Sequence, residues 1–533
     1  MTAHALRIAI AASLCIGTSA TLPGLLRAQA EFAIPVPRGT VRLDITPDWL
    51  SYDHRFGLNV PGYADGSPVP ISLDFSAESL TVAAMPFLGP TQDQIRAASG
   101  LGGFSLSLGR TVTQLNASIR TIPIGIEFGV TNRLAIGVTI PIVRSRMDAN
   151  FAVDSTTGKR GNVAFADPAL VAPFKSEMDA ALAALAQQAQ CGPDSLRAAA
   201  QAALTQLQPF GTLAGAPFLP LASSEAGDSI AARIAGAESA YQQLAARYAA
   251  AGVTLPPLTT SLALPDSAMT RADLERLLTD STFPFSADTM GNAVRTGIGD
   301  ISAHATWQFA DGDRYRGQLL VTTQFPTGGL PYSRSYLDLG TGTHQMGVSV
   351  GLANDLILGS HFLVHAVGRA GGAKADEVER RVAPPGFAFV PLAQLATVKR
   401  SPGSWVGLDI QPTWMLDDAF SVRLSYSYFN QGRTHYSYVT AGDSARTGLP
   451  ASVLDQETDM RLMRIGGGVT FSTLSRYLAG SAAVPYSVTV SYENTVWGRG
   501  GRVPQASIFR IQFRAYVRLF GKPASNPDSS PRQ

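Results

Sequence analysis

The chain has 533 residues, a formal net charge of +2 and only two cysteines. The near-neutral balance argues against a general nucleic-acid-binding protein, because such proteins carry a marked excess of Lys and Arg. Charged residues make up only 15% of the chain, well below the roughly 25% of an average soluble protein.

Residues 1–30 are typical of an export signal peptide. Arg7 supplies a positive start, an apolar core follows, and Ala28-Gln29-Ala30 matches an Ala-x-Ala cleavage site. After cleavage only Cys191 remains, so no intrachain disulfide can form. No later stretch approaches 18 uninterrupted apolar residues, so no membrane-spanning helix is predicted. An exported chain of this kind is either soluble or an outer-membrane β-barrel, whose strands alternate over segments of about 10 residues.

The stretch 122–143 predicts two such strands joined by a short turn at Thr131-Asn132. Every second residue on each arm is apolar, and the residues between them include Gly, Ala, Thr and a single Glu. Alternate side chains of a strand project to opposite faces. The apolar face consists of Ile122, Ile124, Ile126, Phe128, Leu134, Ile136, Val138, Ile140 and Ile142.

Residues 155–294 depart from this pattern and predict a helical insertion. Stretches rich in Ala, Leu and Gln, such as 176–190 and 193–208, favour helix. We expect Asp194 or Ser195 to cap the second helix and Gly252 to close the third. A further short helix with a capping-type start is expected at 270–280.

The same alternation recurs on both sides of the insertion, and it predicts an antiparallel transmembrane β-barrel of about 14 strands, an all-β class. The first part of the barrel spans 31–154 and the second 295–520, followed by a disordered tail at 521–533. The expected strands lie near 41–52, 69–77, 101–110, 116–130, 134–154, 297–309, 317–327, 343–356, 361–371, 403–416, 420–436, 458–472, 484–497 and 504–520.

The composition of the second face distinguishes a barrel from a secreted β-sandwich or jelly roll, which is the alternative fold. A sandwich packs its apolar faces together and exposes a polar face, which usually carries many Lys and Glu. Here the second face is rich in Gly, Ser, Thr and Gln with occasional Arg or Asp, which suits a wet, confined lumen. Short connections also alternate with long ones, as in outer-membrane barrels with short periplasmic turns. This alternation places the insertion outside the cell.

Charged and polar side chains that share the second face are predicted to project into the lumen. An outward Arg would cost about 2–4 kcal/mol at mid-membrane, so the arginines of the last strand are expected to point inward. The residues expected to face the lumen are Glu127, Asp300, His304, Asp409, Arg423, Glu493, Arg510, Arg514 and Arg518. They would form either a network of neutralising ion pairs or an electrostatic constriction that biases which solutes pass.

Three short segments, in order, resemble a known family. Residues 129–143 (GVTNRLAIGVTIPIV), 297–309 (GIGDISAHATWQF) and 322–329 (TTQFPTGG) with 339–352 resemble the outer-membrane family of the MetA pathway of phenol degradation. The likeness covers about 118–154 and 297–372. It implies an outer-membrane barrel that acts as a channel for small, often apolar compounds, and it supplies no catalytic residues. The helical insertion and the residues after Phe520 depart from the family pattern.

The predicted function is therefore passive uptake or efflux of small solutes through a cell outer-membrane channel, with lipid and a small-molecule solute as partners. The alternative is a non-conducting scaffold that presents the insertion to an extracellular partner. No enzyme, cofactor, metal or nucleic-acid role is predicted, since the chain lacks a Gly-x-Ser-x-Gly motif and a metal-spaced Cys cluster. A hydrolase would require a Ser or Asp beside His304 or His344.

Overall fold

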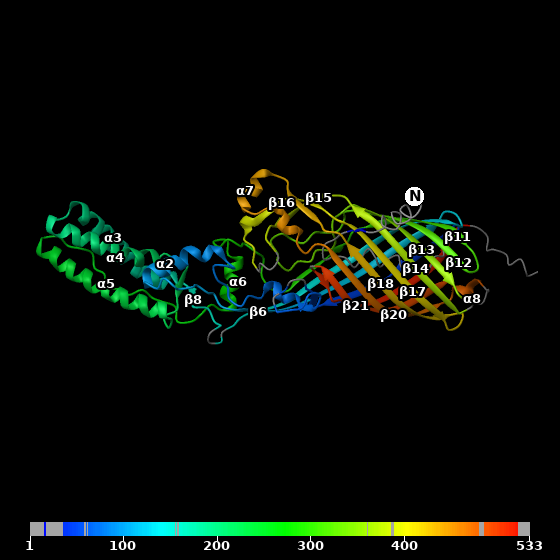
Figure 1. The fold of residues 1–533 in the computed structure, drawn as a ribbon, viewed down its shortest axis with the longest axis horizontal. Coiled ribbons are helices and arrows are strands. Elements are labelled where there is room, and N and C mark those ends of the chain that lie inside the picture. Colours follow the sequence, from blue (N-terminus) through cyan, green and yellow to red (C-terminus); the bar gives the residue numbers. More distant parts are fainter. Residues whose placement is uncertain are drawn as a thin grey trace, which may run out of the picture.

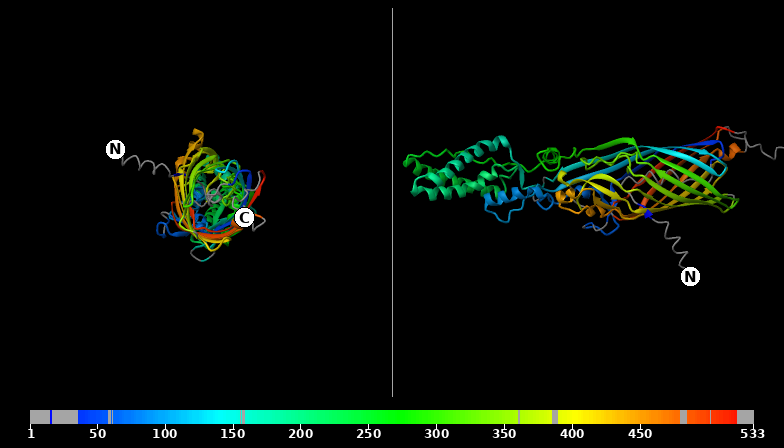
Figure 2. Two further views of the ribbon diagram at one scale, coloured as in Figure 1. Left: turned by 90° about the vertical axis from the view of Figure 1, so that its right-hand side faces the viewer. Right: turned by 90° about the horizontal axis from the view of Figure 1, so that it is seen from above.

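A computed structural model describes residues 15–16, 36–57, 60, 62–154, 156, 159–359, 361–384, 389–478, 484–500 and 502–520. The molecule is elongated, with a β-barrel at one end and a bundle of helices at the other (Figure 1). The view along the long axis shows the strands arranged as a ring (Figure 2). Nearly all of the predicted signal peptide and the whole predicted tail lie outside the described residues.

The barrel is a closed antiparallel sheet with 12 strand positions. Two positions are each shared by two short strands: β2 (Thr40–Ile45) with β3 (Asp48–Tyr52), and β10 (Ala293–Ile298) with β11 (Ser302–Asp311). The ring closes because β2 and β3 pair with the last strand on one side and with β6 on the other. The other ten positions are β6 (Thr111–Gly129), β7 (Leu134–Val153), β12 (Tyr315–Gln324), β13 (Gly347–Ile357), β14 (Phe362–Ala373), β17 (Ser404–Met415), β18 (Phe420–Gln431), β20 (Met460–Ser472), β21 (Tyr486–Gly500) and β23 (Ser507–Arg518).

The expectation of about 14 strands is wrong by two. Residues 69–77 form a three-residue strand and a 3-10 helix rather than a barrel strand, and 101–110 are mostly irregular. The apolar residues of these segments pack elsewhere: Leu106 and Leu108 are 0% and 1% exposed within the core of the helical bundle. Alternation in such short segments reflects that packing rather than a lipid-facing surface.

Short connections gather at one end of the barrel, which we call the turn end. Between β6 and β7 the Thr131 hydroxyl accepts hydrogen bonds from the N–H groups of Arg133 (3.1 Å) and Leu134 (2.9 Å). Between β17 and β18 the Asp417 carboxylate accepts from Ala419 (2.6 Å) and Phe420 (2.8 Å). These side chains satisfy backbone donors that the tight turns leave without a strand partner.

The long connections leave the opposite end, which we call the insertion end. Here β6 and β7 continue beyond the barrel as a two-stranded ribbon that leads to the helices (Figure 1). The helices are α2 (Gly89–Ser99), α3 (Pro168–Cys191), α4 (Asp194–Leu213), α5 (Glu225–Ala250), α6 (Arg271–Thr279), α7 (Ala441–Thr447) and α8 (Leu474–Leu478), and the 3-10 helices are η1 (Ile71–Phe75), η2 (Pro86–Leu88), η3 (Leu392–Gln394) and η4 (Ala451–Asp455). The remaining short strands are β1 (Cys15–Ile16), β4 (His54–Phe56), β5 (Pro68–Pro70), β8 (Val163–Phe165), β9 (Phe218–Pro220), β15 (Asp376–Arg381), β16 (Leu395–Ser401), β19 (His435–Tyr438) and β22 (Val503–Pro504). None of the described helices is long and apolar enough to span a membrane.

The helix ends show which capping expectations hold. Thr270 and Asp273 form a reciprocal capping box at the start of α6, as its sequence predicts. Gly252 adopts a φ of +79° just after α5, a conformation that favours glycine. The expectation for the second insertion helix is wrong, because α4 begins at Asp194 after Pro193, without a side-chain cap. Asp194 instead pairs with Arg197 one turn later, at 2.6 Å.

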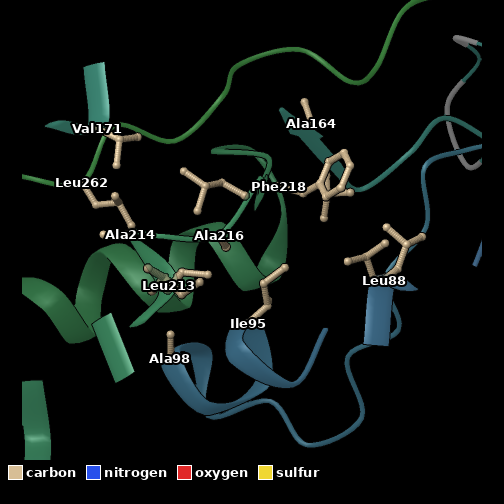
Figure 3. Packing of buried hydrophobic residues seen from close by; sticks show 14 of the residues in the cluster. Leu88, Ile95, Ala98, Ala164, Val171, Leu213, Ala214, Ala216, Phe218 and Leu262 are labelled. Carbon is tan, nitrogen blue, oxygen red and sulfur yellow. The ribbon is translucent and has the colours of Figure 1, made fainter. Parts of the chain in front are cut away.

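A single large hydrophobic core joins the helices to the ribbon. It runs from α3, α4 and α5 through α2 to the inner side of β6 and β7, where Leu115 and Phe151 are buried. Figure 3 shows Ile95 and Ala98 of α2 packed beside Leu213 of α4. Because this core is continuous, the ribbon holds the bundle to the barrel by packing as well as by chain connection.

Candidate functional site

The outer face of the barrel is apolar and exposed. Val138 and Val490 are 42% and 43% exposed, whereas Thr489, on the opposite face, is 2% exposed. A sandwich would bury those valines against a second sheet, so the closed sheet and its exposed apolar face exclude that alternative. The protein is therefore a transmembrane β-barrel of the outer-membrane type, since an outward apolar band on a closed sheet is the surface that lipid requires.

The apolar belt has a defined height. On β7 it runs from Leu134 to Ile142, and the next outward residues are Arg144 and Arg146. That segment rises about 27 Å along the strand, or about 20 Å after a strand tilt of about 40°. The belt thus matches the apolar band of about 25 Å that outer-membrane barrels present to lipid.

Inside the barrel near the turn end, Glu127 of β6 lies at the centre of a buried polar cluster. It forms an ion pair with Arg42 of β2, accepts a hydrogen bond from Thr306 at 3.1 Å, and lies 3.7 Å from the His304 ring. A Cβ atom at Gly137 would meet that ring and the Ile126 carbonyl oxygen. The glycine on the inner face of the first hairpin therefore makes room for the histidine.

A second buried cluster surrounds Asp44 on the same inner face. Its carboxylate accepts hydrogen bonds from Arg514 at 2.7 Å and Gln512 at 3.1 Å, both on β23, and from the neighbouring Thr46. The pair joins the first and last barrel strands, at the position where the ring closes. Burial makes an unpaired charge costly, so these partners stabilise the closure.

Further buried charges lie on β13, β14 and β17, from the middle of the barrel to its turn end. Asp409 accepts a hydrogen bond from Ser427 at 2.6 Å and lies 3.0 Å from Arg369. Asp355 lies 2.6 Å from the His365 ring, and both side chains are at most 3% exposed. The other charged residues buried on this wall are Asp48, Arg423, Arg464, Glu493 and Arg510.

The residues predicted to face the lumen therefore occupy three kinds of position. Glu127, Asp409, Arg423, Glu493, Arg510 and Arg514 are buried on the inner wall, and the His304 side chain is 12% exposed. Arg518 is exposed at the turn end, and Asp300 binds a loop. Their assignment to a wet lumen stays a prediction. Six charged residues on the same wall were not identified from the sequence: Arg42, Asp44, Asp48, Asp355, Arg369 and Arg464.

The inner wall becomes apolar toward the insertion end. Leu50, Ile119, Val143 and Ile508 form a buried layer, which we call the apolar collar. On the strands that carry these four residues, the inward side chains closer to the turn end are mostly polar. On these strands the inner face therefore changes from charged to apolar along the barrel axis, whereas Glu493 on the neighbouring β21, the partner of Ile508, keeps a charge at the level of the collar.

Beyond the collar, on the side of the helical bundle, lies an aromatic cluster that we call the aromatic cap. It consists of Phe75, Phe151, Tyr336 and Phe389, with the ring centroid of Phe389 5.9–6.4 Å from those of the other three. Burial raises the pKa of Tyr336 to about 12, and its protonated hydroxyl donates to the Val390 carbonyl at 2.6 Å. Four separate segments thus meet above the insertion end of the barrel.

The loop between β12 and β13 contributes Tyr336 to this cap and is tied to the barrel by two side chains. Asp300 accepts hydrogen bonds from the backbone of Gly328 and Thr343. Arg295 donates to the Leu330 carbonyl at 2.6 Å and to Asp338 at 2.7 Å. The Gly-Asp and Pro-Thr-Gly segments of the sequence therefore serve to hold this loop.

The described residues contain no group of three or more His, Cys, Asp or Glu side chains that could hold a metal ion. Among the described residues, the His304 ring lies 3.7 Å from Glu127, and Nδ1 of His344 lies 2.9 Å from the Gly328 carbonyl oxygen. Neither contact is the Ser or Asp neighbour that a hydrolase would require.

No known family model and no curated protein matches the chain. Several solved structures are similar in outline. An outer membrane channel from Pseudomonas putida F1 is 9% identical, with 91% of this chain and 98% of that chain covered and a TM-score of 0.41. The toluene transporter TbuX of Ralstonia pickettii is 9% identical, with 91% and 90% covered and a TM-score of 0.28. A FadL homologue of Pseudomonas aeruginosa is 8% identical, with 90% of each chain covered and a TM-score of 0.25. At such values these likenesses carry no argument about function, and the barrel assignment depends on the strands and the belt described above.

Proposed function

We propose that this protein is an outer-membrane channel for the passive passage of small solutes, with the insertion end outside the cell. The observation that carries the proposal is the interior of the closed barrel. Its wall is lined by buried polar and charged side chains while its outer face is lipid-compatible. A polar interior within an apolar outer face is typical of outer-membrane barrels that enclose a water-filled channel.

The interior favours small solutes that have an apolar part. Below the aromatic cap a solute would meet first the apolar collar and then the charged layers around Asp409 and Glu127. An apolar group gains free energy in the collar by leaving water, and the charged layers provide polar contacts farther along. The resemblance of 118–154 and 297–372 to the MetA-pathway family supports the same class of solute.

The second candidate function is a scaffold that presents the helical bundle to a partner. The observation in its favour is the size of the bundle and its firm attachment through the continuous core. In this case the barrel would act only as an anchor and would not conduct.

Single-channel recording on the full-length protein in planar bilayers distinguishes the two functions. A channel gives discrete conductance steps, and these should change when the interior charge Asp409 is replaced in Asp409→Asn. Liposome swelling with small aromatic alcohols and with sugars of similar size then compares solute classes. Absence of conductance in both the wild type and a Phe389→Ala variant with a loosened cap would reject the channel and favour the scaffold.

A further inference from the structure

The outer face of the β6–β7 ribbon carries a row of cations directly above the apolar belt. The last belt row consists of Ile122, Ile142 and Ile298, which are backbone partners across β6, β7 and β10. All three are at least 40% exposed. Two residues farther along each strand, alternate side chains return to the same face, and there Arg120 and Arg144 are partners. Both arginines are exposed.

The neighbours of this row fit a lipid–water interface. Trp49 of β3 is the partner of Arg120 on the side away from Arg144, and Trp is enriched at that depth of a membrane protein. Arg146 lies one row higher on β7 and pairs with Asp148 at 2.7 Å. Arginine stems can lie along apolar surface while the guanidinium reaches the headgroups.

Arg120 and Arg144 form a pair of like charges that an anion would stabilise. Like charges placed directly opposite on neighbouring strands destabilise the sheet, and among the described residues neither arginine forms an ion pair. The guanidinium group binds phosphate through two parallel hydrogen bonds. A phosphate held between the two arginines would turn the repulsion into two favourable contacts.

A groove with both polar and apolar lining continues from this row along the same strands. It has a volume of about 630 Å³ and lies between the ribbon and the segments at 53–54 and 70–72. Its lining includes Asn116, Asn150 and Asn292, together with Asp148 and His54. Amide and carboxylate groups bind hydroxyl groups well, whereas the carboxylates would repel a second phosphate placed there. The groove therefore fits the uncharged sugar part of a ligand whose phosphate lies below it.

We propose that this face of the barrel binds a phosphorylated glycolipid of the outer leaflet. The acyl chains would lie on the belt at Ile122 and Ile142, the phosphate between Arg120 and Arg144 with Arg146 nearby, and the sugar in the groove. The site depends on the membrane placement of the barrel and is independent of whether the barrel conducts. It adds a specific lipid contact where the ribbon leaves the membrane.

The test uses full-length protein in phosphatidylcholine nanodiscs that contain diphosphorylated lipid A, with bound lipid counted by native mass spectrometry. Arg120→Gln/Arg144→Gln should weaken lipid A retention at least tenfold. Arg461→Gln/Arg499→Gln is the matched control, because those two arginines are also backbone partners on an outer face, on β20 and β21, and they do not line the groove. It should change retention less than twofold. Arg133→Gln, at the turn end, should have no effect.

Two further measurements identify the ligand. Lipid A without phosphate should bind no better to the wild type than to the double variant. A lipid A that carries additional core sugars should bind more tightly than lipid A alone, and Asn116→Ala/Asn150→Ala should remove only that difference. If Arg120→Gln/Arg144→Gln and Arg461→Gln/Arg499→Gln lost lipid A retention equally, the specific site would be overturned, because general charge attraction would explain the binding. Inorganic pyrophosphate that binds detergent-solubilised protein as tightly as the lipid would overturn the lipid assignment. Heat-modifiable gel mobility verifies folding, and unchanged conductance separates this result from any failure of the channel proposal.

Discussion

Asp300 and Thr343 are 43 residues apart in the chain, and one carboxylate oxygen of Asp300 accepts both the backbone N–H (2.6 Å) and the hydroxyl (2.8 Å) of Thr343. The other oxygen accepts the N–H of Gly328 at 2.9 Å. The side chain lies at the break between β10 and β11, so it links the barrel wall to both ends of the loop that carries Tyr336 of the aromatic cap.

Replacement of Asp300 by Asn should loosen that loop. The amide can accept at only one of the two oxygen positions, and a hydrogen bond to a charged group contributes about 1.5–3 kcal/mol. We expect faster hydrogen exchange at Gly328 and Thr343 and more frequent conductance fluctuations. Asp313→Asn, in the exposed turn between β11 and β12, is the control. Unchanged exchange in the Asp300 variant would show that other contacts hold the loop.

The lipid-facing assignment predicts a strong dependence on position along β7. Val138→Arg should destabilise the folded barrel in liposomes by about 2–4 kcal/mol, because it places a cation near the membrane centre. Ala152→Arg changes an exposed residue of the same outer face beyond the belt, and it should have almost no effect. Urea unfolding of the two variants in the same lipid measures the difference. Equal effects would contradict the membrane placement of Val138.

The Arg42–Glu127 pair predicts opposite changes in ion selectivity. Glu127→Gln leaves the guanidinium without its carboxylate and should shift the reversal potential in a KCl gradient toward chloride. Arg42→Gln should shift it toward potassium. Each single change should also destabilise the barrel, by about 3–5 kcal/mol, because it leaves one charge buried and unpaired. Shifts of the same sign in both variants would exclude this pair from the conduction path.

The barrel strands could be predicted from the sequence because lipid outside and polar groups inside impose a period of two over many residues. Strands β6 and β7 show this clearly, with outward Ile122 to Phe128 and Leu134 to Ile142. Segments 69–77 and 101–110 have similar local composition, yet their apolar residues pack against the helical bundle. Local alternation carries no information about which surface an apolar face will meet.

The interior contacts could be predicted only in part, because their partners are distant in the chain. Glu127 was identified from its strand face, but Arg42 is 85 residues away and on a short strand. Asp44 and Arg514 are separated by 470 residues and meet only because the ring closes there. The position of Asp300 in the alternating pattern predicts an inward side chain. The break between β10 and β11 instead directs this side chain to the loop between β12 and β13.

The aromatic cap should limit passage through the barrel. Phe389 is 2% exposed and contacts three aromatic rings. Phe389→Ala should lower the stability of this region by about 3–5 kcal/mol and increase conductance. Phe283→Ala, in the helical bundle, is a matched aromatic truncation away from the cap and should leave conductance unchanged. An equal conductance in all three proteins would mean that the cap does not lie on the solute path.

The last prediction concerns the helical bundle and its dependence on pH. Glu177 of α3 accepts hydrogen bonds from the backbone N–H groups of Thr259 (2.6 Å) and Thr260 (2.9 Å). These donors, that of Thr259 first, hold the pKa of Glu177 below its ordinary value of 4.5. A carboxyl group with a lowered folded-state pKa stabilises the fold above its unfolded pKa, and this stabilisation is lost as the pH falls through the folded value. The bundle should therefore lose thermal stability between pH 5 and pH 3.

Two variants isolate this contribution. Glu177→Ala should be less stable than the wild type at pH 7 and should lose less stability on acidification, because it has no carboxylate to protonate. The pKa of Glu238 on α5 is shifted in the opposite direction, because burial and the charge of Glu177 raise it. Glu238→Gln should therefore be slightly more stable than the wild type at pH 7. It should still lose thermal stability between pH 5 and pH 3, because Glu177 is unchanged. Helical melting followed by circular dichroism at pH 7, 5 and 3 gives the comparison. An identical pH dependence in wild type and Glu177→Ala would show that the Glu177 contact does not hold the 259–260 segment against α3.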